Sequence, residues 1–167
     1  KGAPDTPSLR EKGICIGLGT DGAAHGGLSL WNEMKIFRSV MNVVYGSRLN
    51  EPAVMPAEYI LRMATENGYR LMGEDGGRLE AGRKADLITI KMLQPHLYPT
   101  GNTVNTLLEC VTAGDVCDSI VNGKLLMKDR KVLTLDEEKI LAEAAEYMDR
   151  EMKKTGEDTA AERKKVS

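Results

Sequence analysis

The feature with the clearest chemical potential is the carboxylate of Asp21, in the run Gly19-Thr20-Asp21-Gly22. It directly follows Ile14 to Gly19, a short apolar stretch without polar alternation that predicts a strand buried on both faces. Folds of the α/β class place their chemistry at the carboxyl ends of such strands. Asp21 is therefore a candidate metal ligand or general acid/base. The spacing also allows a structural role, in which Asp21 caps the next helix or fixes a turn.

The same glycines offer a second interpretation, because Gly17, Gly19 and Gly22 fit the dinucleotide fingerprint G-x-G-x-x-G. Asp21 would place negative charge where the pyrophosphate has to lie. The motif also requires a strand ending in an acid about 20 residues later, where this sequence predicts a helix instead. We therefore disfavour a nucleotide-binding domain.

Two helices are expected to follow Asp21 and to position it. Residues 29–45 carry apolar side chains at spacings of three and four, as an amphipathic helix does. Residues 57–72 show a similar pattern, with Pro56 before them and Gly73 after them as start and stop signals.

Short strands are expected in the next part of the chain. Ala85 to Ile90 predicts a strand. The segments Val116 to Val121 and Lys124 to Met127 flank Asn122-Gly123, which predicts a hairpin closed by a type I′ turn. A further short strand is expected over Lys131 to Thr134.

Helices and irregular segments complete the chain. Residues 94–102 predict an irregular crossing because they contain two prolines and a glycine, and Val104 to Cys110 predicts a short helix. A last helix is expected from Asp136, with acidic residues in its first turn, to Gly156. The polar residues after it are expected to be disordered.

The composition excludes several classes of function. With a formal net charge of -2 and 4% aromatic residues among 167, the chain lacks the basic patches and stacking platforms of nucleic-acid binders. No apolar run reaches the roughly 20 residues that span a bilayer. Three cysteines without a C-x-x-C pair predict free thiols in a reducing, cytoplasmic location.

Three segments in order carry a resemblance to one family. Ile14 to Ala24, followed by Leu28 to Lys35, resembles the last barrel strand and following helix of the amidohydrolase superfamily. Gly77 to Ile90 is similar to that family's segment G-x-L-E-x-G-K-x-A-D-L, and Val116 to Lys124 to its V-x-x-V-I-V-N-G-K. The subgroup it resembles is that of the cytosine deaminase-like enzymes, which include S-adenosylhomocysteine and methylthioadenosine deaminases and triazine hydrolases.

The resemblance implies an α/β fragment: the last βα unit of a metal-dependent (β/α)8 barrel, then the C-terminal part of a small β-sandwich and a terminal helix. Residues 1–73 would end the barrel, 74–134 would form part of the composite sandwich, 135–155 the C-terminal helix and 156–167 a disordered tail. A complete barrel takes about 250 residues. The chain is therefore expected to be the C-terminal portion of a longer enzyme, without its N-terminal barrel region.

The resemblance also implies a reaction, the hydrolysis of a non-peptide C–N bond in a small-molecule substrate such as a purine- or pyrimidine-like heterocycle. Asp21 would lie beside a divalent metal, zinc or iron, and move the proton of the attacking water to the leaving group. The family also needs a His-x-His pair and two further histidines, and this sequence has only His25 and His96. We therefore expect this chain alone to bind no metal and to be inactive.

Other residues keep two interpretations. His25 either contacts the substrate at the mouth of the pocket or lies in a solvated loop, whereas His96 is expected to be structural. Trp31 either lines the pocket or packs its helix against the barrel, and Asp86 is expected to fix a turn at the start of a strand. An alternative to the enzyme is a non-catalytic truncated unit. Its exposed apolar surface would make it self-associate into a homo-oligomer.

Overall fold

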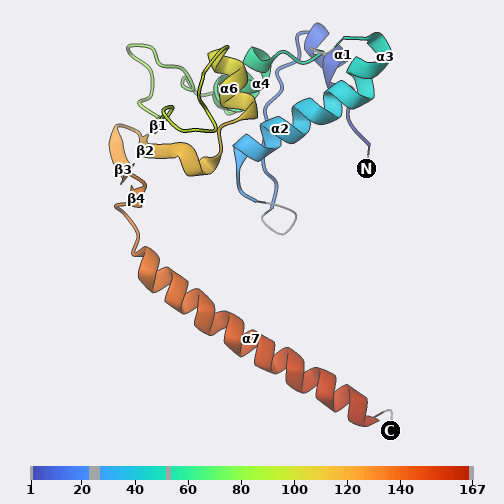
Figure 1. Ribbon diagram of the computed structural model, residues 1–167, viewed down its shortest axis with the longest axis vertical. Coiled ribbons are helices and arrows are strands. Elements are labelled where there is room, and N and C mark those ends of the chain that lie inside the picture. The colour runs from blue at the N-terminus through green and yellow to red at the C-terminus, as the bar shows by residue number, and fades with distance from the viewer. Residues whose placement is uncertain (1, 23–26, 52–53, 166–167) are drawn as a thin grey trace. The chain divides into compact units, whose positions relative to one another are not determined.

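The computed structural model describes residues 2–22, 27–51 and 54–165, and the chain divides into two compact units, residues 1–130 and 131–167. The larger unit contains helices and an antiparallel sheet (Figure 1). The domain boundaries expected at residues 73 and 134 stay predictions.

The helix predicted over residues 29–45 is present. It comprises α2 (Leu30–Met41), the π-helical turn η2 (Asn42–Gly46) and α3 (Ser47–Leu49). Before it lies the short helix α1 (Thr6–Glu11), whose N-cap Asp5 accepts a hydrogen bond from the backbone N–H of Ser8 at 3.3 Å.

The single helix predicted over residues 57–72 is wrong, because two shorter helices occupy that segment, α4 (Ala57–Met63) and α5 (Glu66–Leu71). The break lies at Thr65, whose backbone leaves the helical region at φ −130° and ψ −92°. The Thr65 hydroxyl donates to the Leu61 carbonyl at 2.9 Å, an alternative to helical bonding that threonine favours.

The strand predicted over Ile14 to Gly19 is also absent, since residues 14–20 have no regular secondary structure. Their hydrogen bonds go to helices instead of to a neighbouring strand: Ile14 N–H donates to the Leu9 carbonyl at 3.1 Å, and Leu18 N–H to the Met63 carbonyl at 2.9 Å. A parallel strand forms only beside another strand, and within the described residues nothing of that kind lies next to this segment.

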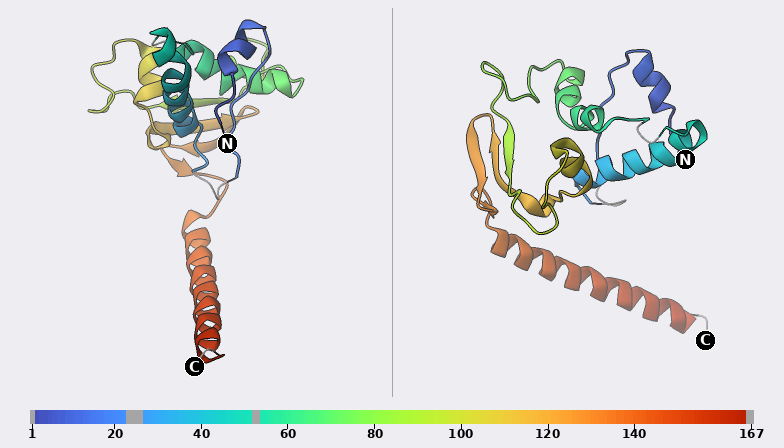
Figure 2. Two further views of the ribbon diagram at one scale, coloured as in Figure 1. Left: turned by 90° about the vertical axis from the view of Figure 1, so that its right-hand side faces the viewer. Right: turned by 45° about the horizontal axis from the view of Figure 1, so that its top comes forward.

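The sheet confirms the predicted hairpin. Strands β1 (Leu87–Ile90), β2 (Val116–Val121) and β3 (Lys124–Lys128) are antiparallel in that order, as Figure 2 shows. Leu87 pairs with Ile120, and Ser119 pairs with Met127. Asn122 and Gly123 both have positive φ, 49° and 73°, as a type I′ turn requires.

Between β1 and β2 the chain forms the helix α6 (Thr103–Glu109), as predicted, and the short 3₁₀ turn η3 (Ala113–Asp115). Arg38 of α2 joins α6 through its guanidinium, which donates to Asn105 Oδ1 at 2.9 Å and to Glu109 Oε1 at 2.8 Å.

The core of the larger unit lies where α2, α4 and α6 meet, and it is rich in methionine, whose flexible side chain fills irregular gaps. Of the apolar face predicted on residues 29–45, Met34 and Met41 are buried, but Val40 and Val44 are exposed. The buried cluster consists of Met34, Met41, Met55, Ala57, Ile60, Met63 and Leu108.

The smaller unit holds the short strand β4 (Lys131–Val132) and the helix α7 (Glu137–Lys165). The sequence predicted that this helix ends at Gly156, and that the residues after it are disordered. The helix instead continues to Lys165. A glycine in a helix interior costs only about 1 kcal/mol relative to alanine, and good helix formers such as Ala160, Ala161 and Glu162 follow it. In the part of the chain that the structure describes, no helix is both long and apolar enough to cross a bilayer.

Candidate active site

Asp21 ends the irregular segment in a left-handed backbone conformation, with φ 55°, and its side chain is exposed. This conformation is uncommon for residues other than glycine, although aspartate and asparagine tolerate it best. Its backbone carbonyl accepts a bond from the Thr20 hydroxyl at 3.4 Å.

The carboxylate of Asp21 makes no hydrogen bond or ion pair within residues 2–22, 27–51 and 54–165. The N-cap of α2 is Ser29, so the alternative in which Asp21 caps the next helix is wrong. Its neighbours Ala23 and Ala24 lie outside the described residues, as does His25, so both interpretations of His25 stay predictions.

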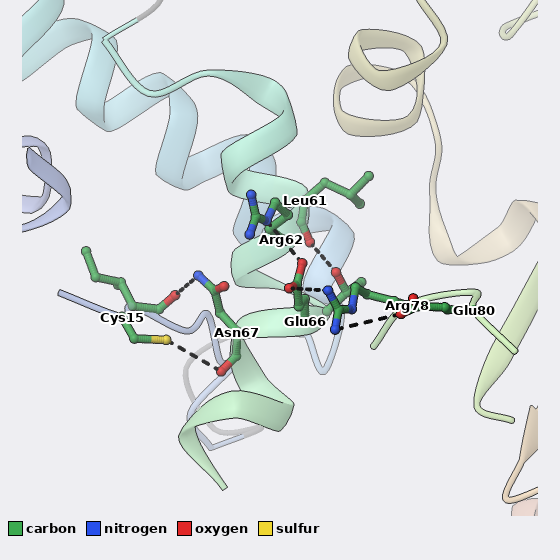
Figure 3. A network of polar contacts seen from close by, with 9 residues as sticks. Cys15, Leu61, Arg62, Glu66, Asn67, Arg78 and Glu80 are labelled. Carbon is green, nitrogen blue, oxygen red and sulfur yellow. Dashed lines mark hydrogen bonds and ion pairs between the residues drawn. The ribbon is translucent and has the colours of Figure 1, made fainter. Parts of the chain in front are cut away.

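Helices α4 and α5 hold the segment that leads to Asp21. Asn67 in α5 donates through Nδ2 to the Ile16 carbonyl at 2.7 Å, and the Cys15 thiol lies 3.9 Å from the Asn67 carbonyl oxygen (Figure 3). Leu18 is bonded to the end of α4 through the Met63 carbonyl. The segment is therefore fixed on both sides of Gly17, a few residues before Asp21.

Glu66 fixes α5 in turn. It accepts a bond from Arg62 Nε at 3.1 Å, and Arg78 Nη1 lies 3.4 Å from its other oxygen (Figure 3). These contacts join α5 to the glycine-rich turn after it.

A cavity of about 620 Å³ lies between the helices and the sheet of the larger unit. Its lining is mostly apolar and includes Trp31, so this side chain both faces a cavity and packs against the core. Two of its polar side chains, Tyr69 and Asp86, are hydrogen-bonded to each other. Asp21 is not among the residues that line it.

His96 and Asp86 have structural contacts. His96 Nε2 lies 3.0 Å from Asp115 Oδ1, which agrees with its predicted structural role. Asp86 does fix a turn, but the turn is that of the neighbouring hairpin, through the backbone N–H of Asn122.

The family of the chain follows from its match to known sequences. The model of the Amidohydrolase family matches residues 1–126. The chain belongs to the amidohydrolase family. The resemblance seen in the sequence is thereby confirmed.

Named relatives of this chain include deaminases. It is 43% identical over 151 residues to 5-methylthioadenosine/S-adenosylhomocysteine deaminase 1 of Syntrophus aciditrophicus, covering 89% of this chain and 33% of that protein. It is 40% identical over 137 residues to 5'-deoxyadenosine deaminase of Methanosarcina acetivorans, covering 81% and 31%. The chain thus spans about a third of the length of the curated relatives it matches, which confirms the prediction that it corresponds to part of such an enzyme.

Solved structures share the fold over a similar extent. An adenosine deaminase from Xanthomonas campestris with bound zinc matches with a TM-score of 0.80 and 24% identity, covering 87% of this chain and 33% of that one. Atrazine chlorohydrolase from Arthrobacter aurescens TC1, complexed with zinc, matches with a TM-score of 0.75 and 26% identity, covering 86% and 32%.

The described residues of the chain do not fit a complete metal site. Among them, no group of three or more histidine, cysteine, aspartate or glutamate side chains could hold an ion. Protein zinc sites normally use three or four ligands. Asp21 could contribute one such ligand, which is fewer than a zinc site needs.

Sequence reasoning missed Asn67 and Tyr69. Asn67 is 6% exposed, which is unusual for an asparagine. The sequence signal was the spacing of Asn67, which lies three residues after Ala64 and seven after Ile60 and so shares their face on the helix predicted over residues 57–72.

Proposed function

We propose that this chain supplies the acid/base carboxylate of a hydrolase that releases ammonia from a purine- or pyrimidine-like ring, and that Asp21 is this carboxylate. The observation that carries the proposal is the side chain of Asp21, exposed and unbonded among the described residues, at the end of a segment held by α4 and α5. The deaminase names of its relatives support the reaction class.

The proposed role of Asp21 follows from carboxylate chemistry. An ionised carboxylate accepts a proton from the attacking water and returns it to the leaving amine as a general acid. We further propose that Asp21 is one ligand of a divalent metal, zinc or iron, that would activate the attacking water. The other ligands would come from the rest of the full-length protein, and the zinc in related structures supports this metal first. His25 would contact the substrate at the mouth of the site.

The position of the chain in a complete enzyme is also a proposal. Residues 1–73 would end a (β/α)8 barrel, and residues 74–134 would form part of a β-sandwich. In such a barrel the segment before Asp21 would gain strand neighbours that it lacks here.

All three cysteines are free, which supports a reducing, cytoplasmic location.

Ammonia release by the full-length protein tests the proposed reaction. The protein, with zinc or iron added, is incubated with 5-methylthioadenosine, S-adenosylhomocysteine, 5'-deoxyadenosine, adenosine and cytosine. We expect stoichiometric ammonia from at least one of them. If none releases ammonia with either metal, the proposed function is wrong.

A second proposal concerns the chain alone, which we infer to be inactive and to self-associate into a homo-oligomer. Ile36, Val40 and Val43 follow one another at helical spacing along α2 and η2 and are exposed, with Val43 at 71% and Ile36 at 58%. Contiguous apolar surface of this kind tends to mark an interaction site. Light scattering should give a mass above 18.3 kDa that falls toward it when Ile36 and Val43 are both changed to lysine. A stable monomer of the unchanged chain would contradict the proposal.

A further inference from the structure

The amide of Asn67 is one of few polar side chains buried in the described part of the chain, together with Thr6 and Asp115. Its Nδ2 donates to the Ile16 carbonyl at 2.7 Å, across 51 positions of sequence (Figure 3). Buried polar groups are costly unless they are paired, and this bond pairs the buried amide of Asn67 with a backbone acceptor in the segment that leads to Asp21. Breaking the bond would leave the buried amide of Asn67 without this partner.

A second hydrogen bond fixes the same stretch of backbone. Leu18 N–H donates to the Met63 carbonyl at 2.9 Å, so residues 16 and 18 are both anchored to the α4–α5 region. The path of residues 16–18 is therefore defined by hydrogen bonds on both sides of Gly17.

We propose that Asn67 is a positioning residue for Asp21, acting through the Ile16 carbonyl to set where the chain delivers the carboxylate. The catalytic consequence of this inference rests on the proposed function of Asp21. The positioning of Asp21 by Asn67 does not depend on that function. An asparagine suits this role because its amide donates from a short side chain. A carboxylate of the same shape offers only acceptors, so Asn67→Asp would set negative charge against the Ile16 carbonyl.

NMR on the 167-residue chain tests the positioning itself. In the unchanged protein, the Nδ2 protons of Asn67 should exchange with water at least about fivefold more slowly than those of exposed Asn50, as expected for a hydrogen bond worth about 1 kcal/mol. In Asn67→Asp, the backbone amide shifts should change from Ile16 to Asp21, and the Leu18 amide should exchange at least about fivefold faster. The matched control is Asn50→Asp, an exposed site whose left-handed backbone also accepts aspartate.

Kinetics on the full-length enzyme test the consequence. A misplaced carboxylate should lower kcat of Asn67→Asp by about 10- to 100-fold with little change in KM, because a displacement of about 1 Å costs on that order. Asn50→Asp should retain the parent kcat.

Three results would overturn the inference: unprotected Nδ2 protons in the unchanged chain, shifts at Ile16 to Asp21 that match those of the control, or an unchanged kcat in Asn67→Asp. The first of these results is measured on the unchanged chain, so it does not depend on whether a variant folds. If the unchanged full-length enzyme releases no ammonia, the proposed function fails, while the NMR results still decide whether Asn67 positions Asp21.

Discussion

The phenol of Tyr69 donates a hydrogen bond to the carboxylate of Asp86 and so joins helix α5 to the residue just before strand β1. The other oxygen of Asp86 accepts from the backbone N–H of Asn122. The bond from Tyr69, the Asn122 N–H and the charge of Lys84 hold the pKa of Asp86 below its usual 3.8, although burial opposes them. The same bond, burial and the charges of Asp86 and Glu74 raise the pKa of Tyr69 above its usual 10.0.

This pair should make stability depend on pH at both ends of the scale. Asp86 has a lowered pKa in the folded state, so it stabilises the fold above its unfolded pKa near 3.8, and the effect is lost as pH falls through the folded pKa. Tyr69 has a raised pKa, so its contribution is complete below 10.0 and is lost as pH rises through the folded pKa.

We expect Tyr69→Phe to lower the urea midpoint at neutral pH and to remove part of the loss of stability at high pH. Circular dichroism during urea unfolding, from acid to alkaline pH, measures both effects. Tyr98→Phe is the matched control, because Tyr98 is 68% exposed. Identical curves for the two variants would contradict the assigned role of Tyr69.

Asp115, which directly precedes strand β2, is the one carboxylate among the buried polar residues of the described part of the chain. It accepts from the Thr112 N–H at 2.8 Å and from the Thr112 hydroxyl at 2.9 Å, and it pairs with His96. The Thr112 N–H first, and then His96 and the Thr112 hydroxyl, lower the pKa of Asp115 below 3.8 against the effect of burial.

Asp115→Asn should therefore cost about 1–3 kcal/mol of unfolding free energy at neutral pH, as for hydrogen bonds to a charged group. The difference from the parent should shrink as pH falls through the folded pKa, since the parent then loses the same charge. Chemical unfolding at several pH values measures this, with exposed Asp149→Asn as the control. A cost that stays constant into acid would show that the charge of Asp115 contributes nothing.

Ile60 is fully buried in the methionine-rich cluster at the core of the larger unit. Ile60→Ala should cost about 2–5 kcal/mol, because it removes buried methylene groups and leaves a cavity. Leu93→Ala, at a position that is 79% exposed in the same unit, should cost far less. Urea midpoints measure both, and equal costs would place Ile60 outside the core.

The hairpin could be predicted because its turn depends on two adjacent residues, Asn122 and Gly123, and both adopt the expected positive φ. The candidate site could be predicted only in part, because it depends on packing between residues far apart in the sequence. The segment before Asp21 has a strand-like sequence, yet a strand also needs a neighbour, and in this chain α4 and α5 provide the hydrogen-bond partners instead. No local pattern encodes the pairing of Asn67 with Ile16, because 51 positions separate them.

Helix ends were predicted less well than helices. The break at Thr65 carries no proline or glycine, so the apolar spacing alone predicted a continuous helix. At Gly156 the opposite error occurred, since the glycine was taken as a stop and the helix continues through it. At Gly156 the cost of the glycine is about 1 kcal/mol, which neighbouring helix formers can offset.

The role of Asp21 as the acid/base carboxylate is tested most directly by kcat of Asp21→Asn in the full-length enzyme. Asp129→Asn is the matched control, because Asp129 is also an exposed aspartate with positive φ. We predict that Asp21→Asn lowers kcat for ammonia release by at least about 100-fold, as loss of general acid–base catalysis does, while Asp129→Asn leaves it unchanged. A folded Asp21→Asn enzyme that works at the parent rate would contradict the account.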